Sequence, residues 1–313
     1  SSAASDVYKR QTTGQRLHVL VGHQSEILSA ALSPDRRQLV TFDATGHGIQ
    51  WNVQDGAQVR EFDGHSGPVL TATFAASGRQ LMTAGTDKTI RLWDLVGRTV
   101  SEFQFEQSVL CAELSADERQ ILVIEGQDAA SLKTATVQGL PPRNSRTVLL
   151  QAESGLRSFP AMEGWPQLGR IRPDGKQFAI LMRDDNVHVY DIATGKLNTK
   201  FNPNRRLVHD LAFSPDSLEL LVMHSDELSL WELESGTERL RIPNQGQFRI
   251  PAASTSAYPE WTPFSPDGRW IITSTNRIKK WPRNPLKEAL QQTPRAISKD
   301  EIRQFSLNPV SEE

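Results

Sequence analysis

The segment that decides the fold is residues 64–94, which read GHSGPVLTATFAASGRQLMTAGTDKTIRLWD. It opens with Gly64-His65 and closes with Trp93-Asp94, and the same two marks stand earlier as Gly22-His23 and Trp51-Asn52. In both segments the Trp follows the His by 28 residues, and the two segments are 42 residues apart. A fixed period near forty residues predicts a repeat architecture.

A second mark inside each segment extends the repeat to six copies. It reads Ser-Pro-Asp-Gly or a degraded form of it, and its steps along the chain are 42, 40, 57, 42 and 51 residues. The six marks begin at Ser33, Ala75, Ser115, Arg172, Ser214 and Ser265. In five copies an aromatic residue follows the mark by 16 to 18 residues, namely Trp51, Trp93, Tyr190, Trp231 and Trp281. The third copy lacks this aromatic and is recognised only by its flanking strands.

Each copy is expected to form one antiparallel meander of four strands. In the second copy, residues 69–74 alternate in polarity and are followed by a tight turn at the mark, then by further strands at 80–83, 89–93 and 98–103. Pro and Asp favour such a turn because Pro fixes φ and Asp bonds its own backbone. A four-stranded unit cannot bury both of its faces alone, whereas radially stacked neighbours can. The pattern therefore predicts an all-β chain folded as a β-propeller.

Through the Gly-His opener, the Ser-Pro-Asp-Gly turn, the Asp six residues before Trp and the closing Trp-Asp, the chain resembles the WD-repeat (WD40) family. The resemblance covers roughly residues 14–282. It implies a WD40-type β-propeller with six recognisable four-stranded blades and a short C-terminal helical tail. It also implies a hydrogen-bonded structural tetrad in the second copy, formed by His65, Thr83, Asp87 and Trp93.

The other copies depart from the tetrad pattern. Thr45 stands in place of the Asp in the first copy, so we expect a broken tetrad there. Asp184 with Tyr190 is expected to serve the fourth copy, while Ser225 and Thr275 replace the Asp in the fifth and sixth.

The ends of the chain differ from the repeats. Residues 1–11 resemble translated sequencing-adapter read-through at the edge of an N-terminally truncated metagenomic gene model, and we expect them to be disordered. We expect a propeller over residues 12–283 and a helical tail over 284–313, where Ser298-Lys299-Asp300-Glu301 forms a capping box. Residues 14–21 are expected to pair beside the strand ending at Trp281 and close six blades, or else a seventh blade precedes them.

Composition and motifs provide little evidence of chemistry. The net charge of −2 and pI near 6.4 give no basic field for nucleic acid, and no apolar run reaches the length of a membrane span. Cys111 is the single cysteine of the sequence and lies in an apolar strand, which is typical of a small buried residue. The seven histidines show no Glu or second His at metal-ligand spacing. We expect no catalytic residue, no metal and no cofactor in a soluble, cytoplasmic protein.

The function expected from the resemblance is a non-catalytic scaffold that binds a protein or peptide through loops on one face. The resemblance places the contacts before the first strand and before the tight-turn Asp of each blade. These residues are Gln24, Glu26, Ala44, Ser66, Pro68, Thr86 and Arg183, with Arg205, Gln247 and Asn276 as counterparts in less regular blades. The alternative is a propeller enzyme, a hydrolase or lyase, with its site in the central channel. The tail resembles that of bacterial, planctomycete-type WD-repeat signalling proteins, which would add an upstream kinase or other signalling domain.

Overall fold

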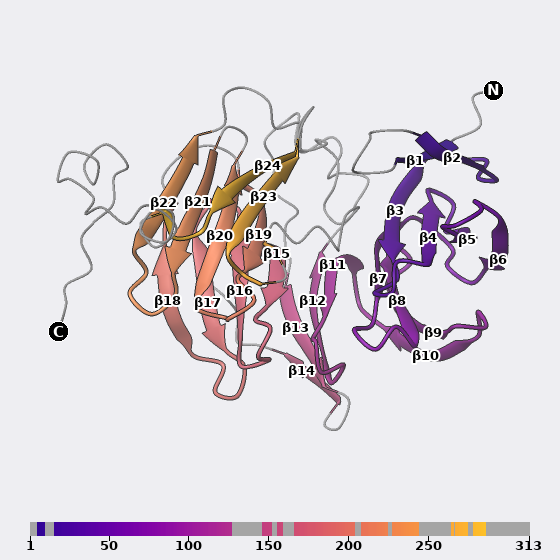
Figure 1. Ribbon diagram of the computed structural model, residues 1–313. Coiled ribbons are helices and arrows are strands. Elements are labelled where there is room, and N and C mark those ends of the chain that lie inside the picture. Colours follow the sequence, from indigo (N-terminus) through magenta and orange to yellow (C-terminus); the bar gives the residue numbers. More distant parts are fainter. Residues whose placement is uncertain are drawn as a thin grey trace. The chain divides into compact units, whose positions relative to one another are not determined.

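The structure is a computed structural model that describes residues 5–9, 16–126, 146–151, 155–158, 166–203, 208–224, 227–243, 264–265, 267–274 and 278–285. Its elements in this part of the chain are antiparallel β-strands (Figure 1). The chain divides into two compact units, Ser1–Gly169 with Ala253–Trp261 and Arg170–Ala252 with Thr262–Glu313. No helix among the described residues is long and apolar enough to cross a membrane.

The first unit contains three four-stranded sheets in sequence order. Sheet 1 is β3 (Ile27–Leu32), β4 (Gln38–Asp43), β5 (Gly48–Asn52) and β6 (Gln58–Phe62). Sheet 2 is β7 (Val69–Phe74), β8 (Gln80–Gly85), β9 (Thr89–Asp94) and β10 (Thr99–Gln104). Sheet 3 is β11 (Ser108–Leu114), β12 (Gln120–Gly126), β13 (Arg146–Gln151) and β14 (Gly155–Ser158). The long step after the third mark thus contains the β12–β13 connection, residues 127–145, which are not described.

The second unit continues the same pattern. Sheet 4 is β15 (Pro166–Ile171), β16 (Gln177–Met182), β17 (Val187–Asp191) and β18 (Leu197–Phe201), with β15 starting at the end of the first unit. Sheet 5 is β19 (Val208–Phe213), β20 (Glu219–His224), β21 (Glu227–Glu232) and β22 (Glu238–Pro243). At the sixth copy, β23 (Trp270–Ser274) pairs with β24 (Ile278–Pro282). The predicted fold class, all-β with repeated four-stranded antiparallel sheets, is confirmed, and residues 286–313 of the predicted helical tail lie outside the described part.

The N-terminal segment differs from expectation. Ser5–Lys9 forms a strand, β1, that pairs antiparallel with β2 (Arg16–Val21), although residues 1–11 were expected to be disordered. Pairing of residues 14–21 beside Trp281, or a seventh blade before them, stays a prediction, because Trp281 belongs to the other unit. The hairpin copies the third and fourth strands of a blade, since its bulge at Tyr8/Lys9 matches the one at Gln50/Trp51 in sheet 1. A free strand edge accepts any backbone of suitable register, which is the physical reason for this pairing.

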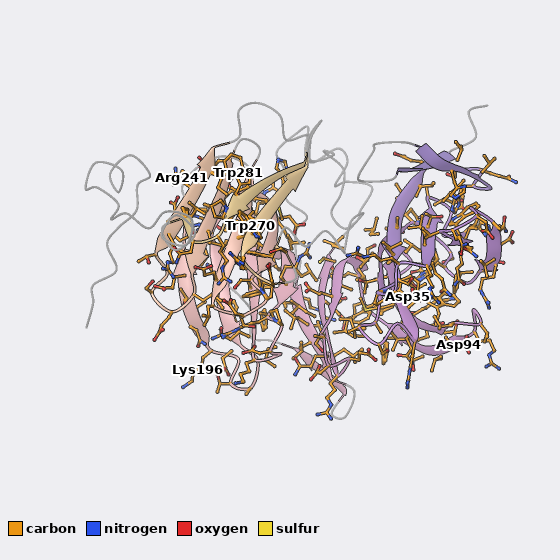
Figure 2. The ribbon with its side chains drawn as sticks, in the orientation of Figure 1. Asp35, Asp94, Lys196, Arg241, Trp270 and Trp281 are labelled. Atoms are coloured by element: carbon orange, nitrogen blue, oxygen red, sulfur yellow. The ribbon has the colours of Figure 1, made fainter. Side chains whose placement is uncertain are left out.

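The four marks that begin with Ser share one side-chain hydrogen-bond pattern in their tight turns. In the first copy, Ser33 Oγ donates to Asp35 Oδ1 at 2.5 Å and accepts from the Gln38 N–H at 2.9 Å (Asp35 is labelled in Figure 2). The fourth residue of the mark has a positive φ in all six copies, at Arg36, Gly78, Glu118, Gly175, Ser217 and Gly268. Glycine is favoured there because it lacks a Cβ. Three of the six copies nevertheless have another residue at this position.

The core of the first unit lies between adjacent sheets. Phe42 of sheet 1 and Trp93 of sheet 2 pack in one cluster around Phe62, whose ring meets that of Trp93 edge-on at 5.5 Å. Met82 of sheet 2 and Val123 of sheet 3 belong to a second cluster. Each inner strand is therefore buried on both faces by its neighbours, which is what stacked blades require.

A half-buried arginine ties the sixth copy to sheet 5 within the second unit. Arg283 follows β24 and forms ion pairs with Glu219 and, at 2.7 Å, with Asp216 of the fifth mark. Its Nη1 also donates to the Gly268 carbonyl at 3.4 Å. The guanidinium therefore joins the turns of two consecutive copies.

The left-handed turn position provides a stability test. Arg36→Gly should raise the free energy of unfolding by about 0.5–1 kcal/mol, because relief of the strained φ outweighs the extra freedom of glycine in the unfolded chain. Gly78→Ala is the reciprocal variant, and its new Cβ meets only ordinary contacts with Pro34 at 3.6 Å. It should lose about 1 kcal/mol in urea unfolding. A stabilised Gly78→Ala protein would contradict this account of the turn.

Candidate functional site

A chain of four buried polar side chains crosses sheet 2. Trp93 Nε1 donates to Thr83 Oγ1 at 2.7 Å, and Thr83 Oγ1 lies 2.7 Å from His65 Nε2. His65 Nδ1 lies 2.8 Å from Asp87 Oδ2. The His65 and Asp87 side chains are 0% and 4% exposed, so loss of any member would leave a partner unpaired away from water.

The partners fix the direction of two bonds in this chain. A carboxylate only accepts, so His65 Nδ1 donates to Asp87. An indole N–H only donates, so Thr83 Oγ1 accepts from Trp93. With the bond between Thr83 Oγ1 and His65 Nε2, all four side chains have partners.

Sheet 1 contains the same chain, contrary to the expectation that Thr45 breaks it. His23 Nδ1 lies 3.0 Å from Asp43 Oδ2, and His23 Nε2 lies 2.7 Å from Thr41 Oγ1. Trp51 Nε1 donates to Thr41 Oγ1 at 2.8 Å. Asp43, at the end of β4, supplies the carboxylate two residues earlier than the position of Asp87, and Thr45 donates its hydroxyl to Asp43 Oδ1 at 2.6 Å.

The sequence contained a signal for Asp43 that alignment on the tight turn hides. The His-to-Thr separation is 18 residues and the Thr-to-Trp separation is 10 residues in both sheets, so these three members are in register. Only the His-to-Asp separation changes, from 22 to 20 residues. A search for any acid near the end of the second strand would have found Asp43.

Both carboxylates are ionised by their surroundings. Burial alone would raise the pKa of Asp87, but the bond and charge of His65, the Thr89 hydroxyl and the Ser66 N–H outweigh it and lower the pKa to about 2. For Asp43, burial likewise opposes ionisation, and the Thr45 hydroxyl and His23 more than compensate, so its pKa is lowered. The two acids therefore act as fixed acceptors, with no role as proton donors near neutral pH.

Sheets 4 and 5 use other polar contacts. Asp184, expected to serve the fourth copy, is exposed and accepts from Asn186 Nδ2 at 2.5 Å, so it is not a buried tetrad member. The Tyr190 hydroxyl instead lies 3.2 Å from His188 Nδ1. In sheet 5, Trp231 Nε1 donates to Ser229 Oγ at 2.8 Å, and His224 Nε2 lies 3.1 Å from the same oxygen.

The structure brings together five of the expected binding residues in the first unit. The Ala44 N–H donates to the Glu26 carbonyl at 2.8 Å, and the Thr86 N–H donates to the Pro68 carbonyl at 3.0 Å. The Ser66 N–H donates to Asp87 at 3.1 Å, so the tetrad carboxylate also holds this loop. We call this set, Glu26, Ala44, Ser66, Pro68 and Thr86, the loop surface.

The two loops of the loop surface lie against each other. A Cβ built on Gly46 would lie 2.6 Å from the Gly67 carbonyl and 2.9 Å from that of His65. This close approach joins the β4–β5 turn of sheet 1 to the β6–β7 loop of sheet 2. Gln24 is exposed in the preceding loop, and Arg183 belongs to the second unit. Arg205, Gln247 and Asn276 fall outside the described residues, as do Ser225 and Thr275.

Comparison with known proteins agrees with this geometry. The family model described as "WD domain, G-beta repeat" matches residues 14–52 and 56–94, which contain sheet 1, the first three strands of sheet 2 and both tetrads. These segments are WD40 repeats, and the repeated four-stranded sheets are consistent with a WD40 propeller.

The relatives found are eukaryotic WD-repeat proteins. "Eukaryotic translation initiation factor 3 subunit I" of Botryotinia fuckeliana is 23% identical over 218 residues, or 67% of this chain and 62% of that protein. "WD repeat-containing protein 26 homolog" of Arabidopsis thaliana is 22% identical over 272 residues, or 76% of this chain and 46% of that protein. The chain thus spans less than two thirds of the length of these relatives.

The two tetrads should be equally important for stability. Asp87→Ala and Asp43→Ala should each lower the free energy of unfolding by about 2 kcal/mol, because each leaves a buried histidine N–H without an acceptor. Thr45→Ala, which removes only a contact to Asp43, should cost less than about 1 kcal/mol. Urea unfolding with an unchanged slope is the measurement. If Asp43→Ala were as mild as Thr45→Ala, the chain in sheet 1 would be dispensable.

The depressed pKa of Asp87 predicts an acid dependence. The pKa of Asp87 in the folded state, about 2, lies below its ordinary value of 3.8, so ionised Asp87 stabilises the fold above about pH 4. That contribution, about 2 kcal/mol, is lost as the pH falls from 4 to 2. The stability difference between wild type and Asp87→Asn, measured by urea unfolding at each pH, should shrink over this interval. A difference that stays constant between pH 6 and pH 2 would contradict the assignment.

Proposed function

We propose that the chain is a non-catalytic scaffold that binds a protein or peptide through the loop surface of sheets 1 and 2. The observation that supports this most directly is the paired backbone bonding of Ala44 to Glu26 and of Thr86 to Pro68, which fixes two successive loops in one arrangement. Loops held before binding lose little conformational entropy when a ligand arrives.

The chemistry of the loop surface suits recognition. Glu26 and Ser66 are exposed, while Ala44, Pro68 and Thr86 are half-buried, so polar groups stand beside a few apolar atoms. The backbone beneath is tied to the buried Asp87 carboxylate, whose lowered pKa keeps it ionised. A rigid base with exposed polar tips is typical of loops that bind a ligand.

The names of the relatives point the same way. The fungal relatives are named as a subunit of translation initiation factor 3, that is, as a component of a larger assembly. By analogy, this chain would act by contact with other proteins. The expected bacterial signalling context and upstream kinase domain remain predictions from the sequence, since the relatives named here are eukaryotic.

A display selection tests the loop surface. Peptides selected from a random library on the immobilised wild-type chain should bind at least about ten-fold more weakly to Ser66→Arg and to Glu26→Arg, a loss of about 1.4 kcal/mol. Val100→Arg, at a side chain that is 53% exposed on the outer strand β10, is the matched control and should bind within about two-fold of wild type. Circular dichroism melts would show that all three variants fold.

The opposite pattern would refute the proposal. If the selected peptides were insensitive to both loop substitutions and lost binding in Val100→Arg, the outer strands would be the binding surface.

A further inference from the structure

Three potential metal ligands meet beside sheet 1, outside the loop surface. β5 pairs with β6 through Gly48↔Phe62 and Ile49↔Glu61, so His47 and Asp63 lie one step beyond the first of these pairs. His47 Nδ1 lies 2.9 Å from Asp63 Oδ1. One ligand atom each of His47, Glu61 and Asp63 lies within 4.8 Å of the other two.

The charge at this position is balanced in other sheets but not in sheet 1. In sheet 2 the residue paired with Glu102 is Arg91, and the two form an ion pair at 3.2 Å. In sheet 5, Arg241 of the outer strand pairs with Glu227 at 3.5 Å. In sheet 1 the residue opposite Glu61 is Ile49, and a second carboxylate, Asp63, follows.

The two carboxylates of sheet 1 have only uncharged partners or histidine. Glu61 accepts from the Gln58 amide at 2.7 Å, and Asp63 bonds to His47. Among the described side chains, neither carboxylate forms an ion pair with a lysine or arginine; Arg91, which packs over Gly64, is paired with Glu102. Two carboxylates therefore stand beside one imidazole in sheet 1, where sheets 2 and 5 place a guanidinium.

The spacing of the three ligand atoms fits one metal ion. Bonds of about 2.1 Å at the tetrahedral angle place two ligands of a single zinc ion about 3.4 Å apart. His47 Nδ1 and Asp63 Oδ1 are 2.9 Å apart, so a small side-chain rotation that separates them admits the ion. Glu61 is exposed, so its carboxylate can approach by side-chain rotation, and the His47 ring lies edge-on to that of His23 with the ring centroids 5.9 Å apart.

The ligand set indicates the class of ion. Mg²⁺ and Ca²⁺ prefer six or more oxygen ligands, whereas imidazole with carboxylates suits zinc and similar transition metals. We propose that His47, Glu61 and Asp63 bind a divalent transition-metal ion of the Zn²⁺ class, with water in the remaining position. On binding, the proton on His47 Nδ1 is exchanged through solvent to Nε2, so that the imidazole stays neutral and the Nδ1 lone pair goes to the metal.

The site would connect the two loops of the loop surface. His47 ends the β4–β5 turn that contains Ala44, and Asp63 leads into the loop that contains Ser66. An ion held by both would cross-link them. The ligands are missed by a search at short spacing because 16 residues separate His47 from Asp63, and only the β5–β6 register brings them together.

Calorimetric titration with Zn²⁺ tests the proposal on the full chain without a polyhistidine tag. Wild type should bind one equivalent, and His47→Asn and Glu61→Gln should each weaken binding at least about ten-fold. His18→Asn is the matched control. His18 is half-buried on β2 with its Nε2 3.0 Å from the Gln54 carbonyl, and its replacement should leave the affinity unchanged.

Thermal unfolding with and without Zn²⁺ provides a second readout. Saturating Zn²⁺ should raise the melting temperature of wild type and His18→Asn but not that of His47→Asn. The unliganded melts show whether each variant folds, and Glu61→Gln preserves the shape of an exposed side chain. The proposal is overturned if wild type takes up no equivalent of Zn²⁺, or if His47→Asn and Glu61→Gln bind it as wild type does, which would indicate adventitious binding only.

Discussion

The fold depends on the burial of both faces of each sheet. In β4 all residues from Leu39 to Asp43 are buried, and in β8 all residues from Leu81 to Gly85. A strand with two buried faces has no solvent side, so its sheet is stable only between neighbours. The apolar clusters accordingly contain residues of two adjacent sheets. The outermost strands are the exception, since Val59 of β6 and Val100 of β10 remain exposed.

Burial on both faces leaves polar side chains of the inner strands without water, and the tetrads provide their hydrogen-bond partners. Thr41 and Thr83 lie within the inner strands at 0% exposure, where an unpaired hydroxyl costs about 1–3 kcal/mol. In sheets 1 and 2 the histidine that precedes the sheet brings one nitrogen atom to this hydroxyl and the other to an acid, which is at the end of the strand in sheet 1 and in the following turn in sheet 2. The same acid also receives a backbone N–H of a loop, Ser66 in sheet 2 and Thr45 in sheet 1. Core and loop are thus stabilised by one charge.

The repeat could be predicted from the sequence because its signals are local. Ser33 and Asp35 form a turn within a few residues, and Trp51 follows at a fixed distance, so five sheets and part of a sixth copy are where the spacing put them. The features that were not predicted from the sequence involve residues far apart along the chain. The role of Asp43 depends on where the His23 ring ends up, and the pairing of β1 depends on an edge that no motif marks. His47, Glu61 and Asp63 meet only through the register of a hairpin.

The position of Asp43 has an evolutionary consequence. Two acids, one at the end of the second strand and one in the turn, reach the same histidine nitrogen, so the carboxylate can move by two residues while the bonds persist. A lineage can pass from one arrangement to the other through an ancestor that carries both acids, without an intermediate that leaves the histidine unpaired. An alignment column at the turn position alone would record the loss of the acid, although the buried carboxylate is still present two residues earlier.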